Sequence, residues 1–293
     1  MRASPRLELP TSVEEAVSLL ADAPEDTMAL AGGTAVSIML HHRLIAPSAL
    51  VALTRLPGLR DITRDDGLVR IGALVTHREV AASPVVRAAL PVLAHTFGVV
   101  ANHRVRAAAT VGGVLAEADY ASDPPATFRA LDATAVVAGP GGERRVPVAD
   151  LTTGYYETSL EPGEIITGVE IPVPAPGTVA AYHKYRSTAS EDRPCVGVAA
   201  LVRLHSDGTC ADLRVCVGAA SAVPVRIAEV EQSAREQPLD AELATQVGEA
   251  YAAAIRPISD VRGSAWYRSE MIRVLVSRTL LSCRSSERET DDV

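Results

Sequence analysis

The chain has few cysteines and histidines, the residues that supply most ligands of zinc and iron–sulfur sites. No two of its four cysteines show the C-x-x-C spacing that supplies zinc or iron–sulfur ligands. Its seven histidines are scattered, and no H-E-x-x-H motif is present. The sequence therefore predicts neither a metal site nor an iron–sulfur cluster in this chain. The cysteines are Cys195, Cys210, Cys216 and Cys283.

Positive charge and long apolar runs are also scarce. The net charge is −8 and the pI is about 5.4, which disfavours nucleic acid and anionic membranes as partners. No stretch approaches the roughly 18 apolar residues of a membrane span. The N-terminal MRASPRLELPTS lacks the apolar core of a signal peptide. We expect a cytoplasmic protein, whose 293 residues suffice for more than one domain.

Lysine is almost missing, because Lys184 is the only lysine among 28 basic residues. A general bias toward arginine is one explanation for this composition. The other is that Lys184 is needed, since a small ammonium group fits where a planar guanidinium does not. The sequence leaves both explanations open.

The two commonest nucleotide-binding motifs are absent, since the chain has neither G-x-G-x-x-G nor G-x-x-x-x-G-K-[ST]. Instead, two glycine pairs each follow a short strand-like segment. Gly32–Gly33 stands in AGGTA after the apolar Met28–Leu30, and Gly112–Gly113 follows Thr110–Val111. This pattern predicts a strand that ends in a turn whose N–H groups can bind a phosphate. A bulge or a hairpin turn is the alternative.

The first half of the chain reads as two α+β parts. Residues 1–57 form a small β-α-β unit, which begins with the capping box Ser12-x-x-Glu15. Residues 58–177 mix strands with helices. They end in a linker rich in proline, which starts at Pro172.

The second half reads as a small sheet, a helical bundle and a tail. Residues 178–281 contain three strands, which we expect to be antiparallel because Asp207–Gly208 predicts a hairpin turn. Residues 282–293 are polar and are predicted to be disordered. The predicted strands are 179–185, 196–204 and 213–218, and the predicted helices are 222–234, 240–254 and 264–281.

Asp123 precedes Pro124 at the start of a predicted helix over 124–131. Aspartate as the N-cap with proline at the first helical position is a common combination. The sequence by itself therefore favours a structural role for Asp123. A carboxylate that binds a hydroxyl group of a ligand is the alternative, and both roles can hold together.

Four stretches resemble a known family, in the family's order from about residue 5 to 281. They are AGGTAVSIML, VRAAATVGGVLAEADYASDPPATFRALDA, PGEIITGVEIP and SAWYRSEMIRVLVSRTL. The family is the FAD-binding medium subunit of molybdenum hydroxylases, which includes the carbon monoxide dehydrogenase medium subunit and the xanthine dehydrogenase FAD-binding subunit. The resemblance implies a p-cresol-methylhydroxylase-type FAD-binding domain of two α+β subdomains. A small domain with a three-stranded antiparallel sheet and a helical bundle follows it.

The resemblance also implies a set of site residues. In the family, noncovalently bound FAD lies between the first two subdomains, and both glycine segments contact its pyrophosphate. Asp123 matches a carboxylate that binds a ribityl or ribose hydroxyl, Ile166 matches a position at the nucleotide end, and Lys184 matches a lysine near the flavin ring. No residue is expected to act as a catalytic acid, base or nucleophile. The pyrophosphate residues are Ala31, Gly32, Gly33, Thr34, Ala35, Thr110, Val111, Gly112, Gly113 and Val114.

The chain departs from the family at two of these positions. The family usually has an asparagine at the position of Val114, and often an aspartate, glutamine or serine at the position of Ala35. If both side chains make hydrogen bonds in the family, their loss removes about 1–3 kcal/mol of FAD binding. Contacts made by the backbone remain.

As a function, the resemblance implies an oxidoreductase flavoprotein that transfers electrons within a complex. The expected partners are a molybdopterin-binding large subunit and a [2Fe-2S] small subunit, together forming a dimer of heterotrimers. Electrons would arrive from the iron–sulfur clusters and leave to an external acceptor. The alternatives are an FAD-free structural docking subunit of the same fold and a stand-alone flavin oxidoreductase.

Overall fold

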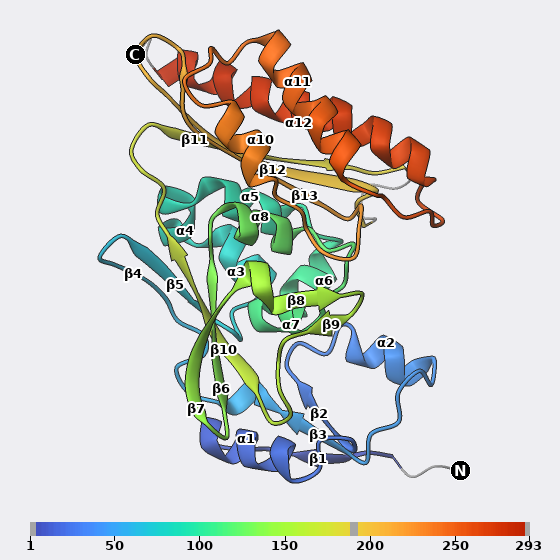
Figure 1. The fold of residues 1–293 in the computed structure, drawn as a ribbon. Coiled ribbons are helices and arrows are strands. Elements are labelled where there is room, and N and C mark those ends of the chain that lie inside the picture. The colour runs from blue at the N-terminus through green and yellow to red at the C-terminus, as the bar shows by residue number, and fades with distance from the viewer. Residues whose placement is uncertain (1–3, 188–192, 291–293) are drawn as a thin grey trace.

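The computed structural model describes residues 4–187 and 193–290, with side chains as far as Arg284. Its mixture of helices and strands confirms the predicted α+β class. The three largest sheets follow one another along the chain and from the bottom to the top of Figure 1, and a fourth, two-stranded sheet belongs to the second predicted part. Because each lies within one of the predicted parts, we keep 1–57, 58–177 and 178–281 as the proposed domain division.

The first part is a parallel sheet of order β1-β3-β2 with two helices. The Ser12 hydroxyl accepts a hydrogen bond from the Glu15 N–H at 3.2 Å and so starts the first helix. The Glu15 carboxylate accepts a hydrogen bond from the N–H of Thr11 rather than from that of Ser12, so the capping box is shifted by one residue. The elements are β1 (Arg6–Glu8), α1 (Val13–Asp22), β2 (Thr27–Leu30), α2 (Val36–His41), β3 (Ala49–Ala52) and the 3-10 turn η1 (Leu53–Arg55).

The second part is a five-stranded antiparallel sheet of order β4-β5-β10-β6-β7, covered by short helices. Pro84, Pro91 and Pro124 each stand at the first position of a helix, where the missing N–H is no loss. The elements are β4 (Ile62–Asp65), β5 (Leu68–Gly72), α3 (His77–Ala82), α4 (Pro84–Ala89), α5 (Pro91–Gly98), α6 (His103–Ala108), α7 (Val111–Glu117), α8 (Pro124–Ala130), β6 (Thr134–Gly139), β7 (Gly142–Pro147), α9 (Val148–Leu151), β8 (Thr152–Gly154), β9 (Glu157–Thr158) and β10 (Ile165–Pro172).

The third part is a three-stranded antiparallel sheet that lies between two helical layers (Figure 1). Alternate residues of its central strand face opposite sides. Ala199 and Leu201 join the core of the second part, whereas Val198 and Val202 join the core under the C-terminal helices. This sheet therefore fixes the third part onto the second. The elements are β11 (Thr178–Tyr185), β12 (Val196–Leu204), β13 (Cys210–Gly218), α10 (Ala228–Ser233), α11 (Ala241–Ala254) and α12 (Ala265–Thr290).

Two predicted boundaries in the third part are wrong. The helix predicted over 222–234 begins only at Ala228, because the residues before it form a β-bridge to strand β13. Helix α12 continues to its last described residue, so 282–290 is helical rather than disordered. Each residue that extends an existing helix adds one hydrogen bond, and Cys283 is buried in the C-terminal core. Residues 291–293 of the predicted tail lie outside the described residues.

The described ranges contain neither a membrane-crossing helix nor a cluster of metal ligands. Within them, no helix combines the length and the apolar character that a bilayer crossing requires. No group of three or more His, Cys, Asp or Glu side chains in these ranges could hold a metal ion. The four cysteines are buried and form no disulfide.

Candidate functional site

The first glycine segment is a loop between β2 and α2, as the sequence predicts. Gly33 has a φ of 71°, a left-handed conformation that glycine adopts without strain. A Cβ atom added to Gly32 would lie 1.9 Å from the carbonyl oxygen of Ala108, so only glycine fits there. The N–H groups of Gly32–Ala35 have no hydrogen-bond acceptor among the residues that the structure describes. The loop therefore offers free backbone donors.

The second glycine segment differs from the predicted strand and turn. Thr110 forms only an isolated β-bridge with Thr76 and then caps α7, so Gly112 and Gly113 lie in the first helical turn. The Thr110 hydroxyl accepts a hydrogen bond from the Gly113 N–H at 3.1 Å. The N–H groups of Val111 and Gly112 donate to backbone carbonyls after β5, at 3.0 and 2.8 Å. This segment starts a helix instead of a turn, because the threonine N-cap accepts a hydrogen bond from an N–H group that would otherwise have no acceptor.

The two glycine segments lie side by side. Gly32 packs against the backbone of Ala108 and Ala109, and this backbone leads directly into the second segment. Gly112 also permits close packing, since its Cβ would lie 2.7 Å from that of Ala73. Because the N–H groups at the start of α7 are already bonded, the free donors at this junction come from the first loop. Unbonded N–H groups in such a loop suit a diphosphate.

Asp123 and Lys184, which are far apart in the sequence, form a buried ion pair. The Lys184 Nζ lies 2.8 Å from Asp123 Oδ2, and both side chains are at least 96% buried. The same ammonium donates to the carbonyl of Val99 at 3.1 Å. The Tyr182 hydroxyl donates to Asp123 Oδ1 at 2.7 Å. This network joins the start of α8 to strand β11.

Asp123 occupies the N-cap position of α8, as the sequence predicts, but its side chain does not cap the helix. Its backbone is helical, with φ −73° and ψ −49°, and its side chain makes no capping hydrogen bond. The carboxylate oxygens bond Tyr182 and Lys184 instead, and these partners are visible only in three dimensions. Burial raises the pKa of Asp123, and the nearby Lys184 ammonium opposes this rise. Burial and the adjacent carboxylate raise the pKa of the Tyr182 phenol.

The sequence analysis missed Tyr182. Residues two apart on a strand share a face, so Tyr182 and Lys184 both point from β11 toward Asp123. Tyr185 points to the other side, where its hydroxyl group forms a hydrogen bond with the hydroxyl group of Tyr267. The alternation of a strand was the signal that could have identified Tyr182.

Two other predicted residues are part of the core of the second part. Ile166 on β10 is 4% exposed and Val114 on α7 is 7% exposed. The side chains of both residues therefore pack inside the protein. An asparagine in place of Val114 would need a hydrogen-bond partner in this apolar surrounding. Thr34 and Ala35 are half-buried in the first glycine loop.

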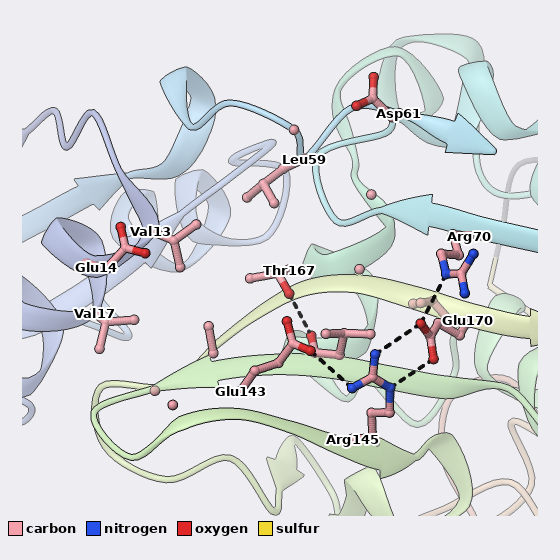
Figure 2. Close-up of a pocket in the computed structure, with 18 of the residues that line it drawn as sticks. Val13, Glu14, Val17, Leu59, Asp61, Arg70, Glu143, Arg145, Thr167 and Glu170 are labelled. Atoms are coloured by element: carbon pink, nitrogen blue, oxygen red, sulfur yellow. Dashed lines mark hydrogen bonds and ion pairs between the residues drawn. The ribbon is translucent and has the colours of Figure 1, made fainter.

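A cavity of about 1070 Å³ lies elsewhere, between helix α1 and the five-stranded sheet (Figure 2). None of the predicted site residues lines it. Its two arginines, Arg70 and Arg145, both pair with Glu170, at 3.2 and 3.1 Å. Further carboxylates, among them Glu14 and Asp61, face the same space. This charge balance disfavours an anionic dinucleotide, so we place the candidate site at the glycine segments.

Family models cover nearly the whole chain. The FAD binding domain in molybdopterin dehydrogenase matches residues 4–174. The CO dehydrogenase flavoprotein C-terminal domain matches residues 180–283. The first model ends in the link between β10 and β11, and the second begins within β11.

Known proteins are similar over the same length. The chain is 33% identical over 281 residues to the 6-hydroxypseudooxynicotine dehydrogenase complex subunit alpha of Paenarthrobacter nicotinovorans, covering 96% of this chain and 95% of the relative. It is 32% identical over 278 residues to the carbon monoxide dehydrogenase medium chain of Hydrogenophaga pseudoflava, covering 94% and 96%. A chain in the solved structure of a carbon monoxide dehydrogenase from Hydrogenophaga pseudoflava that lacks the Mo-pyranopterin moiety of the molybdenum cofactor matches with a TM-score of 0.93 at 31% identity, covering 97% of this chain and 99% of that chain.

Proposed function

The chain belongs to the family of FAD-binding medium subunits of molybdenum hydroxylases, and we propose that it is the electron-transfer subunit of such a complex. It is an oxidoreductase subunit that carries an FAD-binding domain. In the proposed role, electrons enter from the iron–sulfur clusters of a partner chain and leave to an external acceptor. Bound FAD supplies the redox chemistry, and the protein supplies binding, orientation and electrostatics.

The contact of Gly32 with Ala108 carries the proposal. It brings the first glycine loop, with its free N–H groups, against the backbone that leads to the second segment. We assign the pyrophosphate to this junction, the hydroxyl-bearing tail to Asp123, the nucleotide end to Ile166 and the flavin ring to Lys184. The pyrophosphate set is Ala31, Gly32, Gly33, Thr34, Ala35, Thr110, Val111, Gly112, Gly113 and Val114.

The proposed partners are a molybdopterin-binding large subunit and a [2Fe-2S] small subunit, in a dimer of heterotrimers. The relatives support partner chains, since one is named a complex subunit and another a medium chain. The proposed location is the cytoplasm. The four cysteines, which form no disulfide, support a reducing compartment.

The position of the aromatic residues gives further support for partner chains. The chain has one Trp, seven Tyr and two Phe, and four of these ten side chains are buried in the cores. Of the other six, Tyr120 of the second part contacts Asp260 and Arg262 of the third, and Tyr185 and Tyr267 contact each other beside the C-terminal core. The buried four are Phe97, Phe128, Tyr182 and Tyr251, and the other six are Tyr120, Tyr155, Tyr156, Tyr185, Trp266 and Tyr267.

We call Tyr120, Tyr155, Tyr156 and Arg262, together with Trp266 four residues further along the chain, the aromatic surface. The Tyr120 ring meets those of Tyr155 and Tyr156 edge-on, with centroids 5.3 and 6.2 Å apart. The Arg262 guanidinium lies 5.5 Å from the same ring. Trp266, on the first turn of α12, is 72% exposed. Exposed aromatic side chains and arginine are enriched in protein–protein interfaces, and Tyr155, Tyr156 and Trp266 are exposed.

The second candidate is an FAD-free docking subunit of the same fold. One observation favours it, because the N–H groups of Val111, Gly112 and Gly113 are all bonded within the chain. The polar side chains usual in the family at the positions of Ala35 and Val114 are also missing. In this role the aromatic surface would be used and the glycine loop would not.

A titration of the purified full chain with FAD distinguishes the two candidates. The electron-transfer subunit should bind FAD saturably and show the visible flavin spectrum. Gly113→Val and Lys184→Ala should weaken this binding, whereas Gly141→Ala, at a position with no atom within 4 Å of an added Cβ, should not. A chain that stays colourless in excess FAD, with variants indistinguishable from it, would support the docking subunit instead.

A further inference from the structure

Tyr182 is not one of the residues assigned to FAD binding, but it makes a hydrogen bond to one of them, Asp123. Its hydroxyl is a hydrogen-bond donor to Asp123 Oδ1 at 2.7 Å, while Lys184 Nζ lies 2.8 Å from Oδ2. One oxygen of this buried carboxylate therefore accepts a hydrogen bond from a neutral hydroxyl, and the other pairs with a cation. Lys184 has its own second acceptor, the carbonyl of Val99. The three side chains have little freedom to rearrange.

The neighbouring strand leaves room for the Tyr182 hydroxyl. A Cβ atom added to Gly197 on β12 would lie 2.4 Å from that hydroxyl and 3.2 Å from Cζ of the ring. Gly197 pairs with Lys184 in the β-ladder, so the space opens beside the lysine. Tyr182 is 3% exposed, and it belongs to the hydrophobic core that joins the second and third parts. The Tyr182 phenol can therefore occupy this position only because residue 197 is a glycine.

We propose that Tyr182 is a positioning residue for the flavin, which acts by holding the Asp123 carboxylate and, through it, the Lys184 ammonium. The inference rests on the proposed function, because it needs bound FAD near Lys184. Tyr182 itself does not touch the cofactor in this assignment. It fixes how much of the positive charge of Lys184 the carboxylate compensates.

The consequence is electrostatic. A hydrogen bond from a neutral hydroxyl withdraws charge from a carboxylate in a site of low dielectric constant. Without it, the Asp123 oxygens carry more negative charge and cancel more of the Lys184 charge. A cation beside a flavin favours its reduced, more anionic form, so the lost hydroxyl makes reduction less favourable.

The test uses the full chain with the substitution Tyr182→Phe, which removes the hydroxyl and keeps the ring. We expect the reduction potential of bound FAD to become more negative. FAD binding should weaken only modestly, because Tyr182 acts through Asp123 and Lys184 and makes no hydrogen bond to the cofactor itself. Gly197→Ala, which displaces the hydroxyl without removing it, should change both quantities in the same direction. Potentials are measured by equilibrium titration against redox dyes, and affinities by flavin fluorescence.

Two comparisons separate positioning from general loss of structure. Tyr251→Phe removes another buried phenol, which donates to the Val215 carbonyl at 2.7 Å in the C-terminal core. It should leave the potential of FAD unchanged. In an Asp123→Asn background, Tyr182→Phe should shift the potential no further, since residues acting through one contact are not additive.

The inference is overturned if Tyr182→Phe leaves the potential unchanged or makes it more positive. It is equally overturned if the shift persists in full in the Asp123→Asn background. Failure of the wild-type chain to bind FAD would instead contradict the proposed function. The two failures are therefore distinguishable.

Discussion

Gly32 rests on the carbonyl group of Ala108, so closely that an added Cβ would lie 1.9 Å from the oxygen. This contact joins two segments that the sequence could identify only separately. It leaves the N–H groups of the first loop free and places them beside the backbone that leads into α7. The candidate FAD site is built on this junction.

Gly32→Ala is therefore expected to displace the first loop. Overpacking of this kind typically costs about 1–3 kcal/mol of stability, and FAD binding should weaken at least tenfold because the donors move. Chemical denaturation and FAD titration measure the two effects. Gly141→Ala is the matched control, since an added Cβ there meets no atom within 4 Å. Equal behaviour of the two variants would contradict the proposed role of the contact.

Lys184→Met should destabilise the chain even without FAD. It leaves the buried Asp123 carboxylate without its cation, and breaking one half of a buried ion pair costs about 3–5 kcal/mol. The double variant Asp123→Asn with Lys184→Met should lose less than the sum of the single losses, because no uncompensated charge remains. Urea denaturation of the four proteins gives this coupling. Strict additivity would show that the pair does not act as a unit.

His77 should make stability depend on pH. The side chain is 2% exposed, packs edge-on against Phe97 and has no hydrogen-bond partner among the described residues. Burial lowers its pKa from 6.5 to about 4. Between these values the unfolded chain binds more protons, so this stability is complete above pH 6.5 and is lost as the pH falls toward 4.

The predicted loss from His77 is about 3 kcal/mol across this pH range. The variant His77→Leu cannot take up the proton, so its unfolding free energy should fall by about that much less between pH 7 and pH 4. Denaturant titrations of both proteins at the two pH values measure the difference. Identical pH dependence of wild type and variant would show that His77 does not contribute.

Trp266→Ala should weaken assembly and leave the isolated chain intact. Central aromatic residues of an interface often contribute about 2 kcal/mol or more to binding, whereas the exposed indole makes few contacts within this chain. Co-purification with the large and small subunits, followed by size-exclusion chromatography, measures assembly. Leu44→Ala is the control, because Leu44 is equally exposed, at 72%, and lies outside the aromatic surface. Normal assembly of the Trp266 variant would exclude this residue from the interface.

Local signals in the sequence predicted much of the fold. Proline at a first helical position, the Ser12 cap and the alternating strands each depend on neighbours a few residues away. The segment at Thr110 shows the limit of such signals. Its β-branched pair reads as a strand, but the hydroxyl of Thr110 caps a helix whose start is fixed by carbonyls after β5.

By itself, the sequence determined the family, the α+β class, the two glycine segments and the presence of Asp123 and Lys184. Only the tertiary structure decided that these two side chains pair, that Tyr182 holds them and that Gly32 meets Ala108. The reason is physical. Caps and strand periods depend on nearby residues, whereas a buried charge takes whichever partner the folded chain brings within hydrogen-bond reach.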